Sequence, residues 1–341
     1  EQDMGTNDDW LALVEEETLE PDLPICDPHH HLWEFRHDRV EPRYLMDEFQ
    51  KDLQSGHNIV STVFIECRAM YRQDGPEALR FVGEIEFVNG VAAMSASGLY
   101  GPTKVAAGIV GSADLMMGAA AGETLEAQIA AGGGRFRGIR RSATWDPDPN
   151  VRNSRANATP GLLADPTFRE GFAELDSRNL TFEAWVYHHQ IPEVTDLARA
   201  FPGVTIILDH LGGPLGVDSY RGKRDDCFDQ WKADVTELAS CENVMAKIGG
   251  INMDINGFFW HENPKPPTSQ ELHEATEKWY AHMIEQFGVN RCMFESNFPV
   301  DKQSCSYNVL WNSFKRLASG YSADEKAALF HDTAARVYSL D

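Results

Sequence analysis

Three consecutive histidines follow an acid and a proline near the start of the chain, in the segment Asp27-Pro28-His29-His30-His31. Side chains alternate between the two faces of an extended strand. We therefore expect Asp27, His29 and His31 on one face and His30 on the other. Two imidazoles on one face can converge on a metal ion or a substrate oxygen, because neutral imidazole is a common metal ligand and titrates near pH 7. The segment predicts such a site, and a surface loop of histidines is the alternative.

Further groups that can do chemistry follow other apolar runs of the chain. They are Glu66, Arg68, Arg140, Arg141, His188, His189, Asp209, His210, Lys247, Glu295, Ser296, Asn297 and Asp301. Each alone has a structural explanation, since a single histidine is more often a core residue than a ligand. Burying many polar groups together costs free energy unless they bind one another or a ligand. We therefore predict that they gather at one site.

Several of these residues suit the binding of a substrate. Arg140 can hold a carboxylate in two parallel hydrogen bonds, or it can form an ion pair at the end of a strand. Lys247 can contact the substrate or neutralise Glu295, and we favour the second, structural role. We add Glu66, Trp33 and Trp260 to the predicted substrate-binding set. Trp260 belongs to an aromatic loop that we expect to cover the site or to form an oligomer contact.

The elements that must position these groups alternate between strand and helix. We expect strands at 25–29, 59–66, 104–110, 136–141, 180–186, 204–208, 244–248 and 291–294, and helices at 44–55, 75–97, 115–131, 165–178, 192–201, 225–239, 270–287, 305–318 and 322–338. This alternation is typical of a parallel sheet. Eight units without an internal linker predict an α/β fold, a single-domain (β/α)8 TIM barrel over residues 25–341, with long βα loops and an acidic N-terminal arm over residues 1–24. A doubly wound open sheet is the alternative, although no glycine-rich fingerprint follows the first strand.

Composition excludes several classes of partner. The 341 residues contain 30 Lys and Arg and 53 Asp and Glu, a net charge of −23, which argues against binding to nucleic acid or anionic lipid. No stretch of about 18 uncharged apolar residues is present, so we expect no membrane span. Six scattered cysteines without a CxxC pair, and no visible secretory signal, favour a cytoplasmic protein. The expected partner is a small molecule, and a homodimer is compatible with a barrel of this size.

Taken in order, the motifs resemble the amidohydrolase superfamily over Ile25 to Leu340, in particular its lactonase-like branch. The motifs are Asp27-Pro28-His29-His30-His31-Leu32-Trp33, Gly138-Ile139-Arg140, His189-Gln190, Asp209-His210-Leu211-Gly212, Lys247-Ile248-Gly249-Gly250 and Glu295-Ser296-Asn297-Phe298-Pro299-Val300. That branch includes 2-pyrone-4,6-dicarboxylate lactonase and sugar-acid lactonases. The resemblance implies that His29 and His31 bind a metal or, in metal-free members, the substrate. It implies that His189 and His210 complete the site, and that Arg140 holds a carboxylate. The cofactor is then a divalent metal, Zn²⁺ or Mn²⁺, on His29, His31 and His210, or there is none.

Asn297 stands where the family has an aspartate that activates water. An amide cannot accept a proton near neutral pH. Another base can replace the aspartate, with His189, Glu295 and Asp301 as candidates; alternatively, the reaction is not hydrolysis, or the chain has lost activity. We expect a hydrolase that opens a lactone or similar cyclic ester or amide of a small acidic molecule. A decarboxylase or lyase of the same fold and a non-catalytic binding protein are the alternatives.

Overall fold

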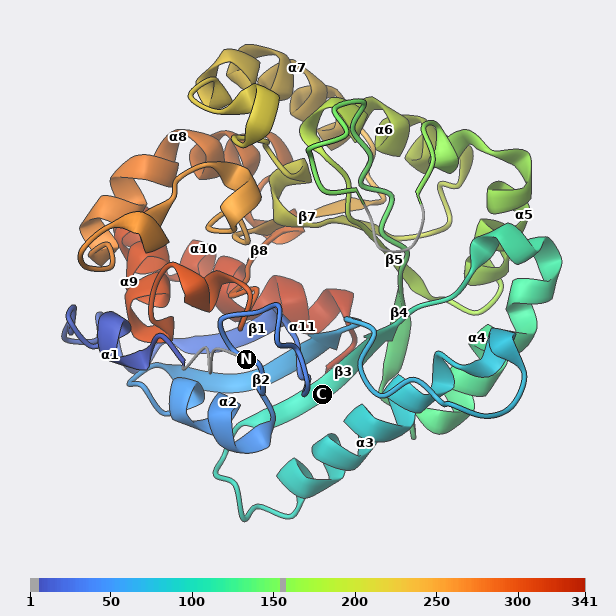
Figure 1. Cartoon of the computed structure of the whole chain (residues 1–341), viewed down its shortest axis with the longest axis horizontal. Helices are drawn as coiled ribbons and strands as arrows, with labels where there is room; N and C mark the ends of the chain where they lie inside the picture. The colour runs from blue at the N-terminus through green and yellow to red at the C-terminus, as the bar shows by residue number, and fades with distance from the viewer. Residues whose placement is uncertain (1–5, 154–157, 341) are drawn as a thin grey trace.

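The computed structural model describes residues 6–153 and 158–340, in which eight strands form a barrel (Figure 1). Each strand runs parallel to the next one in the chain. The strands are β1 (Pro24–His30), β2 (Asn58–Ile65), β3 (Lys104–Gly111), β4 (Phe136–Arg140), β5 (Thr181–Ala184), β6 (Ile206–Leu208), β7 (Val244–Ile248) and β8 (Cys292–Phe294). The predicted (β/α)8 barrel is confirmed.

The ring closes between β1 and the residues that follow β8. The backbone N–H of His31 donates to the carbonyl of Phe298 at 2.8 Å, and that of Asn297 donates to the carbonyl of His29 at 2.9 Å. These bonds place the histidines of β1 directly beside Asn297.

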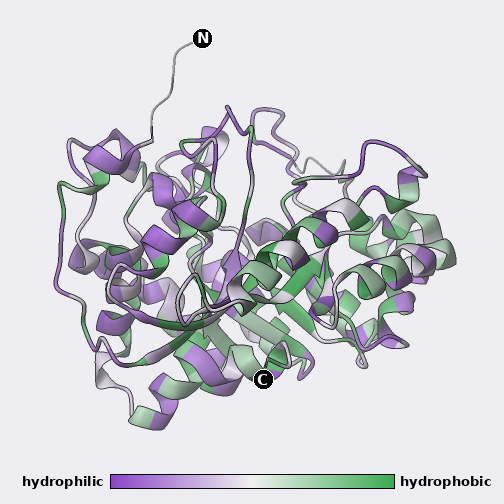
Figure 2. Cartoon of the chain, turned by 90° about the horizontal axis from the view of Figure 1, so that it is seen from below, coloured by the Kyte–Doolittle hydropathy of each residue, from purple (hydrophilic) through white to green (hydrophobic). Residues whose placement is uncertain are grey.

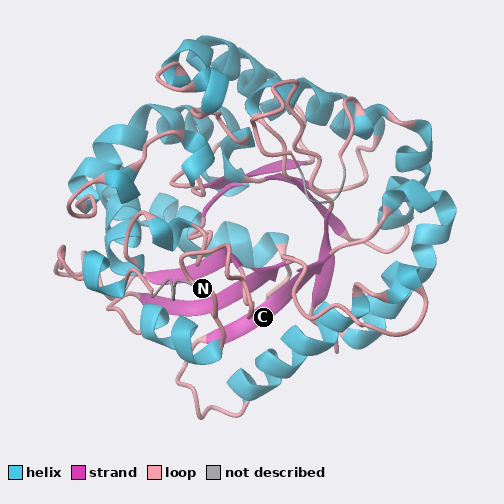
Figure 3. Cartoon of the chain, viewed as in Figure 1, coloured by secondary structure: helices cyan, strands magenta, loops and turns pink. Residues whose placement is uncertain are grey.

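Helices surround the strands (Figure 3). They are α2 (Met46–Leu53), α3 (Val82–Ala96), α4 (Ala121–Ala131), α5 (Pro166–Asp176), α6 (Ile191–Ala200), α7 (Phe228–Ala239), α8 (Ser269–Phe287), α9 (Tyr307–Leu317), α10 (Ala323–Ala327) and α11 (Thr333–Val337). The predicted helix over 115–131 is interrupted, because Gly118 has a φ of +59° that no α-helix contains. The predicted helix over 322–338 is also divided, by a wider turn at Ala328–Asp332. This turn contains Leu329 and Phe330, neighbours in sequence that are both buried.

The core has two layers. An inner cluster fills the ring with Cys26, Val63, Ile65, Val110, Ile207 and Met293, and it is closed below by Tyr338. A larger cluster lies between the strands and the helices. Figure 2 shows the central strands as mostly hydrophobic and much of the outer helical surface as hydrophilic. Because the inside of the ring is filled by apolar side chains, polar side chains are available for chemistry at the carboxyl ends of the strands.

The N-terminal arm, which includes α1 (Asp8–Leu11), lies against α8 and α9. Glu16 accepts a hydrogen bond from the backbone N–H of Ser269 at the start of α8, at 2.8 Å. The Lys315 ammonium of α9 donates to the carbonyls of Leu19 and Glu20 at 2.7 and 2.8 Å. Within the described residues, no helix has both the length and the apolar character needed to cross a membrane.

Candidate active site

A cavity of about 370 Å³ lies over the carboxyl ends of the strands. Its lining includes seven residues from the predicted site: His31, Glu66, Arg68, Arg140, Arg141, His210 and Asn297. Trp33 also lines it, with its ring stacked on that of His31 at a centroid distance of 6.0 Å. A cavity of this volume accommodates one small molecule.

The two cavity histidines present the same ring nitrogen without a protein partner. His31 Nδ1 donates to the carbonyl of Ile65 at 2.8 Å, and His210 Nδ1 donates to the Glu295 carboxylate at 2.7 Å. Since both acceptors are oxygens, each Nδ1 carries a proton. Among the described residues, neither Nε2 atom has a hydrogen-bond partner. Burial lowers the pKa of His31 well below its usual value, so its ring is neutral at physiological pH.

Backbone shape brings the His210 ring into place. Gly250, just after β7, has a φ of +69°, and a Cβ there would lie 1.9 Å from His210 Nδ1. Only glycine therefore permits the contact between this turn and the imidazole.

A buried charged layer lies below these histidines. Lys247 contacts Glu183 at 2.7 Å, Asp209 at 3.5 Å and His29 Nδ1 at 3.1 Å. Burial alone lowers the pKa of Lys247, but Glu183 and Asp209 outweigh burial and raise it, so the lysine is charged. Burial also raises the pKa of Glu183, and the Lys247 ammonium opposes that rise. The sequence interpretation paired Lys247 with Glu295, whereas the structure pairs it directly with Glu183 and Asp209.

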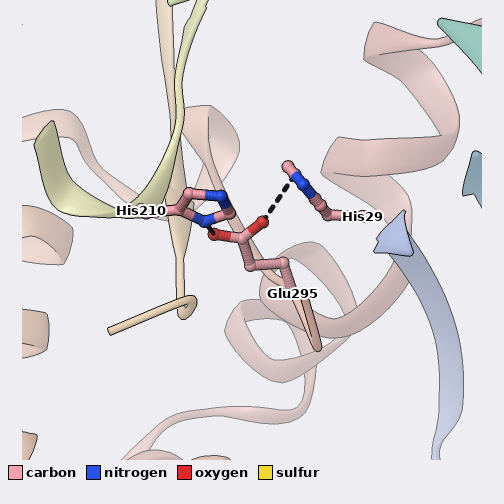
Figure 4. Close-up of side chains that lie close together, drawn as sticks. All are labelled: His29, His210 and Glu295. Carbon is pink, nitrogen blue, oxygen red and sulfur yellow. Dashed lines mark hydrogen bonds and ion pairs between the residues drawn. The ribbon is translucent and has the colours of Figure 1, made fainter. Parts of the chain in front are cut away.

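His29, His210 and Glu295 form a group that can hold a metal ion. One nitrogen of each histidine and one oxygen of Glu295 lie within 4.8 Å of one another (Figure 4). Glu295 Oε2 lies 2.9 Å from His29 Nδ1, and none of the residues that the structure describes donates a hydrogen bond to it. Burial lowers the pKa of His29 well below its usual value, so its ring is neutral. Lys247 also contacts Nδ1 at 3.1 Å, so a metal ion bound at this nitrogen would displace the ammonium from it.

The donor set suits a divalent metal. Two imidazoles and one carboxylate leave a coordination position open, as in catalytic zinc sites. Three buried carboxylates of this layer contact the cations Lys247 and Arg140: Glu66, Glu183 and Asp209. The fourth, Glu295, contacts only the rings of His29 and His210 among the described residues. The group differs from the predicted metal set because Glu295 takes the place of His31. A second group, His29 with Glu183 and Asp209, does not fit a metal because the Lys247 ammonium already contacts all three.

Arg140 lines the cavity but is already engaged. Its Nε donates to Glu66 Oε1 at 2.9 Å, its Nη2 donates to the Glu66 carbonyl at 2.6 Å, and its Nη1 lies 3.4 Å from Asp209. The ion pair at the strand end, an alternative in the sequence interpretation, is therefore present.

The side chain of Asn297 is hydrogen-bonded to a buried aspartate, Asp301. Its amide donates to Asp301 at 2.8 Å, and its side chain is buried at the base of the cavity. Burial raises the pKa of Asp301 to about 7. Asp301 itself does not line the cavity among the described residues.

The structure does not bring Asp27 to the two cavity histidines. The pairing register of β1 with β2 shifts between Asp27 and His30, so strict alternation fails there. The Asp27 carboxylate instead accepts hydrogen bonds from the Tyr307 hydroxyl of α9 and from the Ser296 backbone, at 2.9 and 3.0 Å. His29 is fully buried beneath His31 and His210 and does not itself line the cavity.

His189 and Trp260 also lie elsewhere. His189 contacts Asp146 at 2.9 Å with a third of its side chain exposed, because it sits on a short 3₁₀ turn after β5. Trp260 stacks on Phe258 at a centroid distance of 5.7 Å. The loop that carries Trp260 reaches the cavity through Met253 and Ile255 instead.

The cavity walls are rich in arginine. Among the described residues, seven arginines and three carboxylates line the cavity, the acids being Glu66, Glu77 and Asp114. The arginines are Arg36, Arg39, Arg68, Arg80, Arg140, Arg141 and Arg152. This composition is opposite in sign to the net charge of −23 of the whole chain. An anionic ligand is therefore favoured in the cavity.

Comparisons with known proteins agree with this geometry. A family model described as amidohydrolase matches residues 26–340. An uncharacterised protein of Sinorhizobium fredii, y4mH, is 32% identical over 337 residues, which cover 94% of this chain and 99% of that protein. An L-fucono-1,5-lactonase of Burkholderia multivorans is 26% identical over 209 residues, which cover 61% of this chain and 64% of the lactonase. A crystal structure of an amidohydrolase from Burkholderia multivorans with bound zinc has a TM-score of 0.71 and 23% identity, and the match covers 93% of this chain and 99% of that one.

Proposed function

This chain belongs to the amidohydrolase family and is a hydrolase, and we propose that it opens a lactone or similar cyclic ester of a small acidic molecule. The similarity to a lactonase supports this reaction class. The arginine-rich walls of the cavity support an acidic substrate.

One observation carries the proposal: His31 and His210 lie at the base of one cavity, each with Nδ1 held by an oxygen acceptor and with no hydrogen-bond partner on Nε2 among the described residues. Ester hydrolysis needs an acceptor for the proton of the attacking water. Asn297 cannot be that acceptor. We assign the proton to His31 Nε2, which burial keeps neutral and therefore able to accept.

His29, His210 and Glu295 would hold a divalent metal, Zn²⁺ or Mn²⁺, and the zinc in a structural relative supports this. Such an ion, when bound, polarises the ester carbonyl and acidifies a bound water. Without the ion, Glu295 still orients the His210 ring by accepting a hydrogen bond from its Nδ1. Asn297 orients the substrate carbonyl with its amide, and the stacked Trp33 and His31 rings exclude water from one side.

The test is turnover of a panel of five- and six-membered lactones, with and without carboxylate groups, followed by proton release in weak buffer. His31→Gln and His210→Gln should each lower kcat/KM by about 100-fold or more, the usual contribution of an acid–base group. His261→Gln is the matched control, because that histidine is exposed and lies outside the cavity.

Full turnover by either cavity variant would refute the assignment. Release of carbon dioxide from aromatic carboxylates, without lactone opening, would instead indicate a decarboxylase. Elemental analysis of wild-type protein and of Glu295→Gln tests the metal group, and we expect the variant to retain less bound metal.

A further inference from the structure

Arg141 is a buried guanidinium on the cavity wall. It follows directly after β4, lines the cavity, and is 8% exposed. Its Nη1 donates to the carbonyl of the next residue, Ser142, at 2.8 Å. Within residues 6–153 and 158–340, no carboxylate lies at ion-pair distance from it. A buried charge without a counter-ion is costly, so the position calls for an anion from outside the protein.

The neighbouring Arg140 shows the contrast. Arg140 uses Nε, Nη1 and Nη2 on Glu66, Asp209 and a backbone carbonyl, so its fork is satisfied within the protein. The acid with the largest electrostatic effect on Arg141 is Asp114, and that carboxylate accepts a hydrogen bond from the backbone of Met116 at 3.0 Å. Two adjacent arginines thus differ in role: Arg140 stabilises the base of the cavity, and Arg141 is open to a ligand.

We propose that Arg141 is the anion-binding residue of the substrate site and that it holds a carboxylate or phosphate group separate from the reacting ester. The proposal deepens the proposed function and rests on it, since it takes this cavity as the substrate site. A guanidinium can bind such oxyanions through two parallel hydrogen bonds. Arg140 was expected to fill this role, and its ion pairs prevent it. The site then selects lactones that carry an anionic group over uncharged ones.

Binding can be measured on the full chain without knowing the substrate. Isothermal titration with citrate and with inorganic phosphate separates a carboxylate from a phosphate preference. Arg141→Gln should raise the Kd of the preferred anion at least tenfold. Arg199→Gln is the matched control, because Arg199 is exposed, lies outside this cavity and pairs with Glu237 at 3.0 Å. It should change the Kd less than threefold.

If Arg141 had a purely structural role, replacing it would lower the melting temperature of the protein. Because no carboxylate of the described residues pairs with Arg141 in the free protein, Arg141→Gln should melt at the same temperature as wild type or higher. If that variant is not recovered, Arg141→Lys, which keeps the charge and loses the fork, should still weaken binding at least threefold. Unchanged binding in the Arg141 variants, equal weakening by Arg199→Gln, or no binding of either anion to wild type would overturn the proposal.

Kinetics separate this proposal from the proposed function. For a lactone that bears a carboxylate and for its methyl ester, Arg141→Gln should lower kcat/KM for the acid tenfold or more and leave the ester nearly unchanged. Equal loss on both would overturn the anion-binding role while lactone hydrolysis stands. Anion binding that depends on Arg141, without turnover of any lactone, would overturn the hydrolytic function while the anion site stands.

Discussion

At the end of β8, Asn297 and Asp301 act as one unit. The Asn297 amide donates to the Asp301 carboxyl at 2.8 Å inside a buried site. Burial raises the pKa of Asp301 to about 7, and the amide donor partly opposes this. A carboxylate in the place of Asn297 would face Asp301 without a donor. The asparagine therefore fits its local partner, even though it departs from the family pattern.

The change Asn297→Asp should consequently destabilise the protein rather than restore a family-like base. Two carboxyls at this distance share one proton, so their folded-state pKa lies above the unfolded value. Stability then falls as the pH rises, by up to about 2.7 kcal/mol between pH 6 and 8 for one proton held only by the folded state. Denaturant unfolding at both pH values measures it, with exposed Asn290→Asp as the control. Equal stability of Asn297→Asp and wild type at pH 8 would contradict this account.

Gly250 offers a second test on a single residue. Gly250→Ala would place a Cβ 1.9 Å from His210 Nδ1 and displace the ring from Glu295. Misplacing a catalytic group by about 1 Å costs on the order of 100-fold in rate, which we expect in kcat. Gly222→Ala is the control, since Gly222 has a similar φ of +72° and open space around its Cα. Equal losses of activity in the two variants would show that backbone strain, and not the His210 contact, is responsible.

At the scale of the element, the three consecutive histidines at the end of β1 have two different roles. His29 and His31 serve the site, whereas His30 stacks on Phe49 of α2 at a centroid distance of 4.3 Å and contacts the Thr62 hydroxyl at 2.9 Å. Burial lowers the pKa of His30 to about 3. His30 points to the opposite face from His29 and His31 because successive side chains alternate along a strand.

His30 should therefore make folding sensitive to acid. Below pH 6.5 the unfolded chain binds a proton at this residue that the folded chain cannot bind, so stability falls as the pH decreases towards 3. At pH 5 this loss is about 2 kcal/mol relative to pH 8. His30→Gln should remove that part of the acid sensitivity, and unfolding at pH 5 and 8 measures it. Exposed His261→Gln should leave the pH dependence as it is in wild type. If His30→Gln has the same pH dependence as wild type, the prediction fails.

Sequence patterns predicted the strands well, because buried parallel strands are short apolar runs. They predicted less of the site. Alternation misplaced Asp27 because register shifts leave no mark in the sequence. Glu183 was missed as a partner of Lys247, since the two residues are 64 positions apart and meet only when the barrel closes. An acid inside the apolar strand Thr181–Ala184 was the one available signal.

At the scale of the whole molecule, the net charge is negative, whereas the charged residues around the cavity are mostly positive. The chain carries a net charge of −23, yet arginines outnumber carboxylates around the cavity among the described residues. Self-repulsion of the outer charge opposes the compact state, while the cavity attracts anions. Salt screens both effects over a Debye length of about 10 Å at 0.1 M.

Added salt should therefore stabilise the fold and weaken anion binding in the same protein. Between 10 and 300 mM NaCl we expect the melting temperature to rise by about 1 to 2 °C, the shift that about 1 kcal/mol produces in a chain of 341 residues. Over the same range the Kd for citrate should increase several-fold. Thermal melts and titrations in NaCl and KCl measure both quantities, and equal results in the two salts exclude an effect specific to one cation. A melting temperature that falls with salt would mean that surface ion pairs, and not net repulsion, dominate the electrostatics of this barrel.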